Sequence, residues 1–323
     1  MPDGVDRFIH KQEGVLLKLA KQSFTFALQT SRPPDMFHRL ILALVSIVVF
    51  ASCAETRIHD KPEWGKVFEK HGIGDGCFII RDHTHESIYY YNKDRVTRRF
   101  PPASTFKIFN SLVALDIPIA PDEQYVIRWD SVARWNEDWN RDMTMREAFK
   151  LSNVGYYQEL ARRIGKDYMQ HYLDTVQYGN REMGGKIDEF WLRGPLMISA
   201  DEQAGFVKKL YFDELPFSER THRIVRSMML QEQTDDYKIS YKTGTMDLED
   251  STIYWIVGFA ERIEHVTEHE KSMNKSNIRN YPYFFAQNFS VARADSNTNW
   301  FKTRVALLHD LLGEMQVLPA KAN

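Results

Sequence analysis

The order of secondary-structure patterns along the chain constrains its fold more than any other feature. Residues 76–91 hold two apolar and aromatic runs around a polar turn, which is typical of a β-hairpin. Helical patterns then follow one another over residues 144–230, and strand patterns return only after them. This order lacks the alternation of a parallel α/β sheet. We predict an α+β fold with an antiparallel sheet built from both chain ends, flanking helices and an inserted helical lobe.

The C-terminal third contains three apolar runs typical of strands, at residues 237–241, 252–260 and 283–289. A last amphipathic helix is expected near residues 300–315. Residues 261–280 separate the second and third runs, and they are charged and polar where a tight turn would suffice. We interpret this insertion as solvent-exposed.

Composition excludes several classes of function. Lysine and arginine (42) nearly balance aspartate and glutamate (44), so nothing in the overall charge recruits nucleic acid. The two cysteines, Cys53 and Cys77, are too few for a disulfide framework. No glycine-rich phosphate loop is present, and we expect no metal or organic cofactor. Small molecules are the expected partners, and the oligomeric state is not indicated.

The N-terminal segment is typical of an export signal. An apolar run at residues 40–50 follows His38 and Arg39, and it is shorter than the roughly 20 residues that span a bilayer. We predict an over-extended N-terminus at 1–35, a signal peptide at 36–53 and a catalytic domain at 54–323. Cys53 follows Ala51 and Ser52, which leaves two interpretations open: a periplasmic protein, or a lipoprotein anchored to the membrane through Cys53.

A Ser-x-x-Lys motif at Ser104 and Lys107 is the first candidate for catalytic chemistry. It opens an apolar helix expected over residues 104–116, so the two side chains lie one turn apart on the same face. A serine hydroxyl needs a base to become a nucleophile, and a lysine can serve if apolar neighbours such as Phe106 lower its pKa. The motif alone is weakly specific, because Ser272 and Lys275 repeat it within the polar insertion.

Three further motifs make the first copy specific. Ser152-Asn153-Val154 follows 48 residues after Ser104, and Tyr-Gly-Asn follows at residues 178–180. Lys-Thr-Gly at residues 242–244 then comes after a predicted strand. A cation, a hydroxyl and a small residue at that position favour binding of a carboxylate beside an acyl group.

These motifs, in this order and at these spacings, resemble those of the class D (oxacillinase-type) serine β-lactamases of the penicillin-recognising superfamily. The resemblance covers roughly residues 76–318 and includes the blocks PPASTFKIFNSLVALD (101–116) and YGNREMGGKIDEFWLRGPLMISADEQ (178–203). It implies a β-lactamase/transpeptidase-like fold and hydrolysis of β-lactam antibiotics.

The resemblance also implies roles for individual residues. Ser104 would form the acyl-enzyme, Lys107 would be the general base as a carbamate made with carbon dioxide, and Ser152 would relay a proton to the leaving nitrogen. The carbamate pocket would comprise Val154, Trp191, Leu192 and Phe106. The substrate-binding residues would be Lys242, Thr243, Gly244, Thr245 and Arg304, with the amides of Ser104 and Thr245 as the oxyanion hole. Tyr178 and Asn180 would form the cleft wall in a structural role.

One departure from the family pattern concerns Thr245, which stands where family members usually carry an aromatic residue, so substrate preference stays open. Two alternative functions also stay open. A penicillin-binding sensor or peptidase would be acylated at Ser104 without turnover. A zinc hydrolase would use His265, Glu268 and His269, which spell His-x-x-Glu-His within the insertion.

Overall fold

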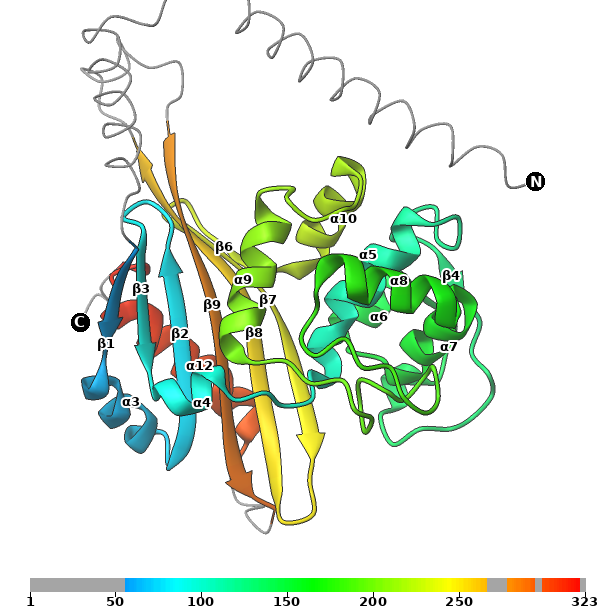
Figure 1. The fold of residues 1–323 in the computed structure, drawn as a ribbon, viewed down its shortest axis with the longest axis horizontal. Helices are drawn as coiled ribbons and strands as arrows, with labels where there is room; N and C mark the ends of the chain where they lie inside the picture. The colour runs from blue at the N-terminus through cyan, green and yellow to red at the C-terminus, as the bar shows by residue number, and fades with distance from the viewer. Residues whose placement is uncertain (1–55, 266–277, 294–297, 320–323) are drawn as a thin grey trace, which may run out of the picture. The chain divides into compact units, whose positions relative to one another are not determined.

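The computed structural model describes residues 56–265, 278–293 and 298–319, which form one compact unit (Figure 1). The expected N-terminal extension, the signal peptide with Cys53, the second Ser-x-x-Lys motif and two of the three zinc-motif residues lie outside the described residues. No helix in the described ranges is both long and apolar enough to cross a membrane.

Seven strands of the described residues form one sheet in the order β1-β3-β2-β9-β8-β7-β6. Their bounds are β1 Arg57–Asp60, β2 Asp75–Asp82, β3 Ser87–Tyr91, β6 Leu230–Gln233, β7 Tyr237–Asp247, β8 Ser251–His265 and β9 Ile278–Ala292. Every neighbouring pair is antiparallel except β1 with β3. N-terminal β2 pairs with C-terminal β9, so the predicted sheet built from both chain ends is confirmed.

Helices cover both faces of this sheet (Figure 1). They are η1 Pro62–Trp64, α3 Gly65–Lys70, α4 Lys93–Thr97, η2 Ala103–Phe106, α5 Lys107–Asp116, η3 Glu137–Trp139, α6 Met145–Lys150, α7 Val154–Ile164, α8 Lys166–Val176, α9 Ala200–Tyr211, α10 Glu219–Met229 and α12 Trp300–Glu314. The helices from η2 to α10, together with the short strands β4 (Val126–Ile127) and β5 (Met143–Thr144), make up the predicted helical lobe.

Two hydrophobic cores explain why the strand sequences are continuously apolar rather than alternating. In β2, Cys77 and Ile79 belong to the core shared with the lobe, whereas Phe78 and Ile80 belong to the core shared with α3 and α12. Successive side chains of a strand point to opposite faces, so a sheet covered on both faces needs apolar residues at every position. Cys77 is a free, buried thiol within this pattern.

The structure corrects two expectations about the late strands. Lys-Thr-Gly at 242–244 lies inside β7 rather than after a strand, because pairing with β8 continues to Asp247. The polar insertion begins and ends as sheet, since Ile263 pairs with Asn280 and His265 with Ile278. Backbone pairing extends this hairpin past the packed part of the sheet, where polar side chains remain exposed.

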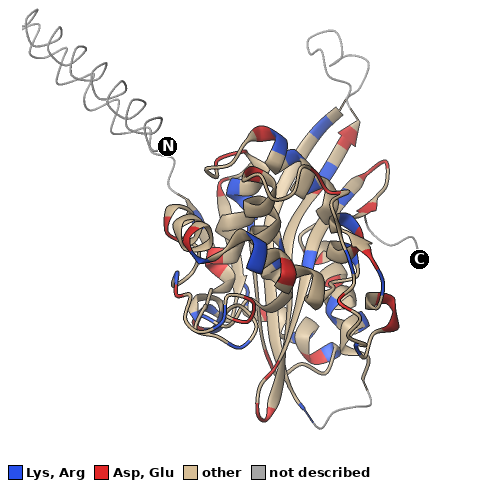
Figure 2. Cartoon of the chain, turned by 90° about the vertical axis from the view of Figure 1, so that its right-hand side faces the viewer, with Lys and Arg blue, Asp and Glu red and all other residues tan. Residues whose placement is uncertain are grey.

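Charged residues of both signs are interspersed along the described strands and helices (Figure 2). This distribution matches the near balance of acidic and basic residues in the sequence.

Candidate active site

The turn that carries Ser104 lies at the start of the lobe and packs against β7. Ala103, immediately before Ser104, has a left-handed backbone with φ 49°, which L-residues adopt at a steric cost. Its amide donates to the carbonyl of Trp191 at 3.1 Å, and Thr105 Oγ1 donates to Pro102 O at 2.7 Å. These bonds hold the strained turn and leave the Ser104 side chain partly exposed at its tip.

Lys107 lies directly beneath the serine. Its Nζ donates to Ser104 Oγ at 2.6 Å, and the side chain is 1% exposed. Burial lowers the pKa of Lys107 to about 7, because a charged ammonium is poorly solvated among apolar groups. A lysine of this pKa is largely neutral slightly above pH 7 and can accept the proton of the serine it contacts.

A second serine-lysine pair faces the first across the junction of sheet and lobe. Lys242 Nζ of β7 donates to Ser152 Oγ at 3.0 Å and to Thr243 O at 3.2 Å. Ser152 also has a left-handed backbone, with φ 56°. Burial lowers the pKa of Lys242 well below its usual value, and the neighbouring Lys107 lowers it further. The sequence motifs of strand and lobe therefore meet in one site.

One edge of β7 is only partly paired with another strand. Within the described residues, β6 pairs with β7 only up to Ser240, so residues 241–247 have no strand partner on that edge. Gly244 lets the nucleophile turn approach this edge, because an added Cβ would lie 3.0 Å from Pro102 O and 3.3 Å from Thr105 N.

Arg304 reaches the same strand from α12. Its Nη1 donates to Gly244 O at 3.1 Å and to Thr245 Oγ1 at 3.0 Å, and the side chain is 7% exposed. Burial lowers its pKa to about 10. The hydroxyl of Thr245, at the position where an aromatic residue is usual, thus serves as the acceptor that positions this guanidinium.

Aromatic side chains pack around the turn that carries Lys107, and one of them has an unpaired donor. Phe106 stacks on the indole of Trp191 at 5.4 Å between ring centroids, and Tyr157 lies 5.4 Å from Lys107 Nζ. Trp191 Nε1 is buried without a hydrogen-bond partner among the described residues. Val154 opens α7 directly after Ser152 and Asn153, and Leu192 packs against the lobe core.

Comparisons with known proteins identify the family. Residues 68–267 match the model of the penicillin binding protein transpeptidase domain. A probable β-lactamase, YbxI, from Bacillus subtilis is 39% identical over 242 residues, which cover 74% of this chain and 88% of the relative. The chain belongs to the class D β-lactamases.

Solved structures of related proteins agree with this assignment. A class D β-lactamase YbXI from Nostoc is 35% identical, with a TM-score of 0.70 over 80% of this chain and 100% of that one. The C-terminal domain of the BlaR penicillin receptor from Bacillus licheniformis is 26% identical, with a TM-score of 0.71 over 82% of this chain and 99% of that domain. The mixed α+β fold of this class D β-lactamase is therefore the one shared by these structures.

The two residues predicted at the cleft wall have structural positions in this class D β-lactamase. Tyr178 is buried behind the nucleophile turn, where its ring contacts Phe106, Phe109 and Phe206. Asn180 donates to Pro195 O at 2.7 Å and accepts from the Met197 amide at 2.9 Å, which closes the loop after α8.

Sequence reasoning missed the group that supports the nucleophile turn of this class D enzyme from behind. Gln203 of α9 is fully buried, and its Nε2 donates to Thr105 Oγ1 at 2.8 Å, while Tyr178 OH donates to Gln203 Oε1 at 3.4 Å. The available signal was a glutamine directly after the capping box of Ser199 and Glu202, at a position that the apolar face of α9 would otherwise fill.

The described part of this class D enzyme holds no cluster of three or more side chains suited to a metal ion. His265 lies in strand β8 with its Nε2 3.1 Å from Asp235 O, rather than on a helix face as the zinc motif requires. The other two residues of that motif lie outside the described ranges.

Proposed function

We propose that this protein hydrolyses β-lactam antibiotics through an acyl-enzyme at Ser104 and so gives resistance to them. The observation that carries the proposal is the 2.6 Å contact between Ser104 Oγ and the Nζ of a buried Lys107 whose pKa is lowered to about 7. Membership of the class D β-lactamases supports the same reaction, because the named relatives are β-lactamases.

The acylation step follows from the two serine-lysine pairs. Lys107 accepts the proton of Ser104 Oγ, which attacks the carbonyl carbon of the four-membered ring. The amides of Ser104 and Thr245 would stabilise the developing oxyanion, at about 3 kcal/mol per donor. The carbon-nitrogen bond of the ring then breaks. Ser152 Oγ gives its proton to the leaving nitrogen and takes up the proton held by Lys107, which restores the base, while Lys242 Nζ holds the serine in place.

Deacylation uses Lys107 as the base a second time. Water attacks the ester carbonyl, Lys107 accepts a proton from the water, and the carbon-oxygen bond to Ser104 breaks. The proton returns to Ser104 Oγ, and the product leaves as a carboxylic acid with the ring opened. Atoms and charges balance without a metal or redox cofactor.

A carbamate formed from carbon dioxide on Lys107 fits the residues present. Carbon dioxide reacts with a neutral amine, and burial lowers the pKa of Lys107 to about 7, so that a large fraction of it is neutral near that pH. Trp191 Nε1 is a buried donor without a described acceptor, and Phe106 stacks on its ring one residue before Lys107. The carbamate would supply an anionic oxygen as the base, with Trp191 as its donor and Val154, Leu192 and Phe106 as the apolar surroundings.

The charge of the site favours an anionic substrate. Lys242 and Arg304 are both buried, and neither forms an ion pair with a carboxylate among the described residues. A buried cation without a counterion costs free energy, which a bound anion recovers. Lys242, Thr243 and Arg304 would therefore hold the carboxylate that β-lactam antibiotics carry, along the edge of β7.

A second candidate function is a penicillin-binding sensor that is acylated and does not turn over. The structural likeness to the BlaR penicillin receptor favours this candidate. The apolar surroundings of Lys107 and the unpaired donor of Trp191 favour turnover, because they stabilise a base that persists after acylation.

Hydrolysis of a chromogenic β-lactam by the full chain separates the two candidates. We expect many product molecules per enzyme molecule, with the acyl adduct visible by mass spectrometry only at early times. A stable adduct with one equivalent of product would contradict hydrolysis and establish the sensor.

Replacement of Trp191 by phenylalanine tests the carbamate. We expect kcat to fall about tenfold or more without added bicarbonate and to recover partly at saturating bicarbonate, because the lost donor weakens the carbamate rather than the serine. Phe190 is adjacent and equally buried, so Phe190→Leu controls for lost packing. Equal bicarbonate dependence in the wild type and Trp191→Phe would argue against Trp191 as the donor to the carbamate, and no bicarbonate dependence in either protein would argue against the carbamate itself.

We also propose that residues 36–53 direct export and that residues 54–323 are the catalytic domain, in the periplasm or anchored through a lipid on Cys53. The apolar run at 40–50 supports this proposal. N-terminal sequencing and mass analysis of the mature protein would identify the cleavage site and any lipid.

A further inference from the structure

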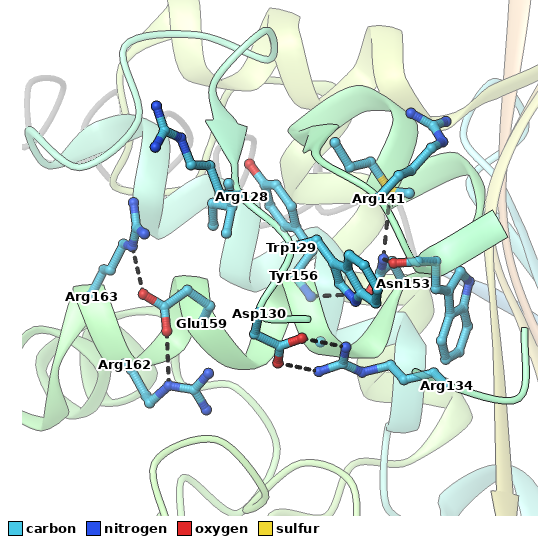
Figure 3. Close-up of a pocket in the computed structure, with 14 residues that line it drawn as sticks. Arg128, Trp129, Asp130, Arg134, Arg141, Asn153, Tyr156, Glu159, Arg162 and Arg163 are labelled. Carbon is cyan, nitrogen blue, oxygen red and sulfur yellow. Dashed lines mark hydrogen bonds and ion pairs between the residues drawn. The ribbon is translucent and has the colours of Figure 1, made fainter. Parts of the chain in front are cut away.

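A pocket rich in arginine opens on the lobe, behind the turn that carries Ser152. It has a volume of about 280 Å³ and lies between the segment around β4, the loop that follows it and the outer face of α7 (Figure 3). Its charged lining consists of Arg128, Asp130, Arg134, Arg141, Glu159, Arg162 and Arg163. Five arginines and two carboxylate residues thus line the pocket.

The carboxylates of the lining are already engaged. The carboxylate of Asp130 accepts hydrogen bonds from both terminal nitrogens of Arg134, at 2.8 and 2.7 Å. Glu159 is shared between Arg162 at 3.0 Å and Arg163 at 2.8 Å, as the dashed lines in Figure 3 show. Within the lining, one carboxylate thus serves two guanidinium groups on the α7 side of the pocket.

Arg128 adds a cation without a counterion. It forms no ion pair or hydrogen bond with any residue in the described part of the chain, and Figure 3 draws no contact from it. Two other arginines draw on carboxylates outside the lining, since Arg141 pairs with Glu147 and Arg162 also pairs with Asp188. Counting those two carboxylates still leaves the group with one net positive charge, and counting the lining alone leaves three.

The pocket shares wall residues with the turn after Ser152, but it lies apart from the catalytic residues. Asn153 and Gly155, which flank Val154, form part of its wall. The guanidinium of Arg134 packs on Gly155, where an added Cβ would lie 2.6 Å from Cζ. None of Ser104, Lys107, Lys242 and Arg304 lines the pocket, so the cations that would bind the carboxylate of a β-lactam belong to a different site.

We propose that this pocket binds a small oxyanion of the phosphate class that carries at least two negative charges. Guanidinium groups donate paired hydrogen bonds that match phosphate oxygens, and several of them around one cavity favour an anion of more than one charge. A volume of about 280 Å³ accommodates inorganic phosphate or pyrophosphate without displacing the walls. The proposal does not depend on the hydrolytic function proposed above.

Calorimetric titration of the full chain with inorganic pyrophosphate, at constant ionic strength, tests the proposal. We expect one site per chain with a Kd below about 1 mM, and at least tenfold weaker binding by Arg128→Gln and Arg163→Gln. Arg223→Gln is the matched control, because Arg223 is an exposed arginine of α10 outside the pocket. The rate of β-lactam hydrolysis by Arg128→Gln should equal that of the wild type.

Three results would overturn the proposal. One is equal affinity in the wild type and Arg128→Gln. Another is competitive inhibition of hydrolysis with Ki equal to Kd, which would place the anion at Lys242 and Arg304. The third is binding of vesicles of anionic phospholipid without binding of pyrophosphate, which would make the arginines a membrane contact. If the protein did not hydrolyse β-lactams, the activity assay would show it, and the pyrophosphate titration would still test the arginine-rich pocket.

Discussion

Replacing Ser104 by alanine is expected to abolish β-lactam hydrolysis, with kcat/KM at least about 10⁴-fold lower than in the wild type. The hydroxyl that contacts Lys107 at 2.6 Å is the atom that forms the acyl bond, and alanine offers no replacement. The measurement is hydrolysis of a chromogenic β-lactam together with mass spectrometry, which should detect no covalent adduct in the variant.

The chain supplies a matched control for this variant in its second Ser-x-x-Lys motif. Ser272→Ala removes a serine from the same sequence pattern and should leave both turnover and acylation unchanged. Retention of activity in Ser104→Ala, or its loss in Ser272→Ala, would show that the nucleophile has been assigned to the wrong motif.

Replacing Lys107 by alanine is expected to lower kcat by about 10³-fold, because general-base catalysis contributes roughly 10²–10⁴-fold. Lys275→Ala, from the second motif, should have no effect. The loss should arise in both half-reactions, so a slowly formed acyl adduct should persist in Lys107→Ala and be seen by mass spectrometry. Rapid turnover in this variant would contradict the role of Lys107 as base.

The pH dependence of the wild-type enzyme follows from the same residue. Burial lowers the pKa of Lys107 to about 7, so the neutral, proton-accepting form is lost below that pH. Activity should rise with pH through about 7 and then level off, with a rate about tenfold below the plateau one unit below the pKa. The residual activity of Lys107→Ala should lack this inflection, and an inflection that remains would assign it to another group.

Local sequence was sufficient to predict the elements and the first catalytic pair. Ser104 and Lys107 are three residues apart at the start of an apolar helix, so helical periodicity alone brings them together. The hairpin at 76–91 was likewise predicted from a short pattern, and the structure confirms it.

The second pair could not be predicted from local sequence. Ser152 and Lys242 meet only because β7 packs beside the lobe, and the named family resemblance rather than any periodicity joined them in advance. The left-handed backbones of Ala103 and Ser152 were also invisible, because neither residue type signals a positive φ. Tertiary contacts, such as the bond from the Ala103 amide to Trp191 O, impose these conformations.

Strand ends were the least predictable part of the fold. In Lys-Thr-Gly only Thr243 favours a strand, so the apolar pattern ends before the motif. The ladder with β8 nevertheless continues, because backbone groups rather than side chains form its hydrogen bonds. The same reasoning explains why the polar residues after Ala260 were expected to leave the sheet and instead extend a hairpin.

Pairing of β2 with β9 has a consequence for how the chain is made. The strand that contains Cys77 acquires its partner at Asn288 only after the whole lobe and most of the sheet have been synthesised. Contacts between such distant segments slow folding, because closing a long loop costs conformational entropy before the paired strands gain any contact free energy. Until then β2 is paired only with β3 and its other edge is unpaired, so loss of the last fifty residues would leave an aggregation-prone product rather than a shortened enzyme.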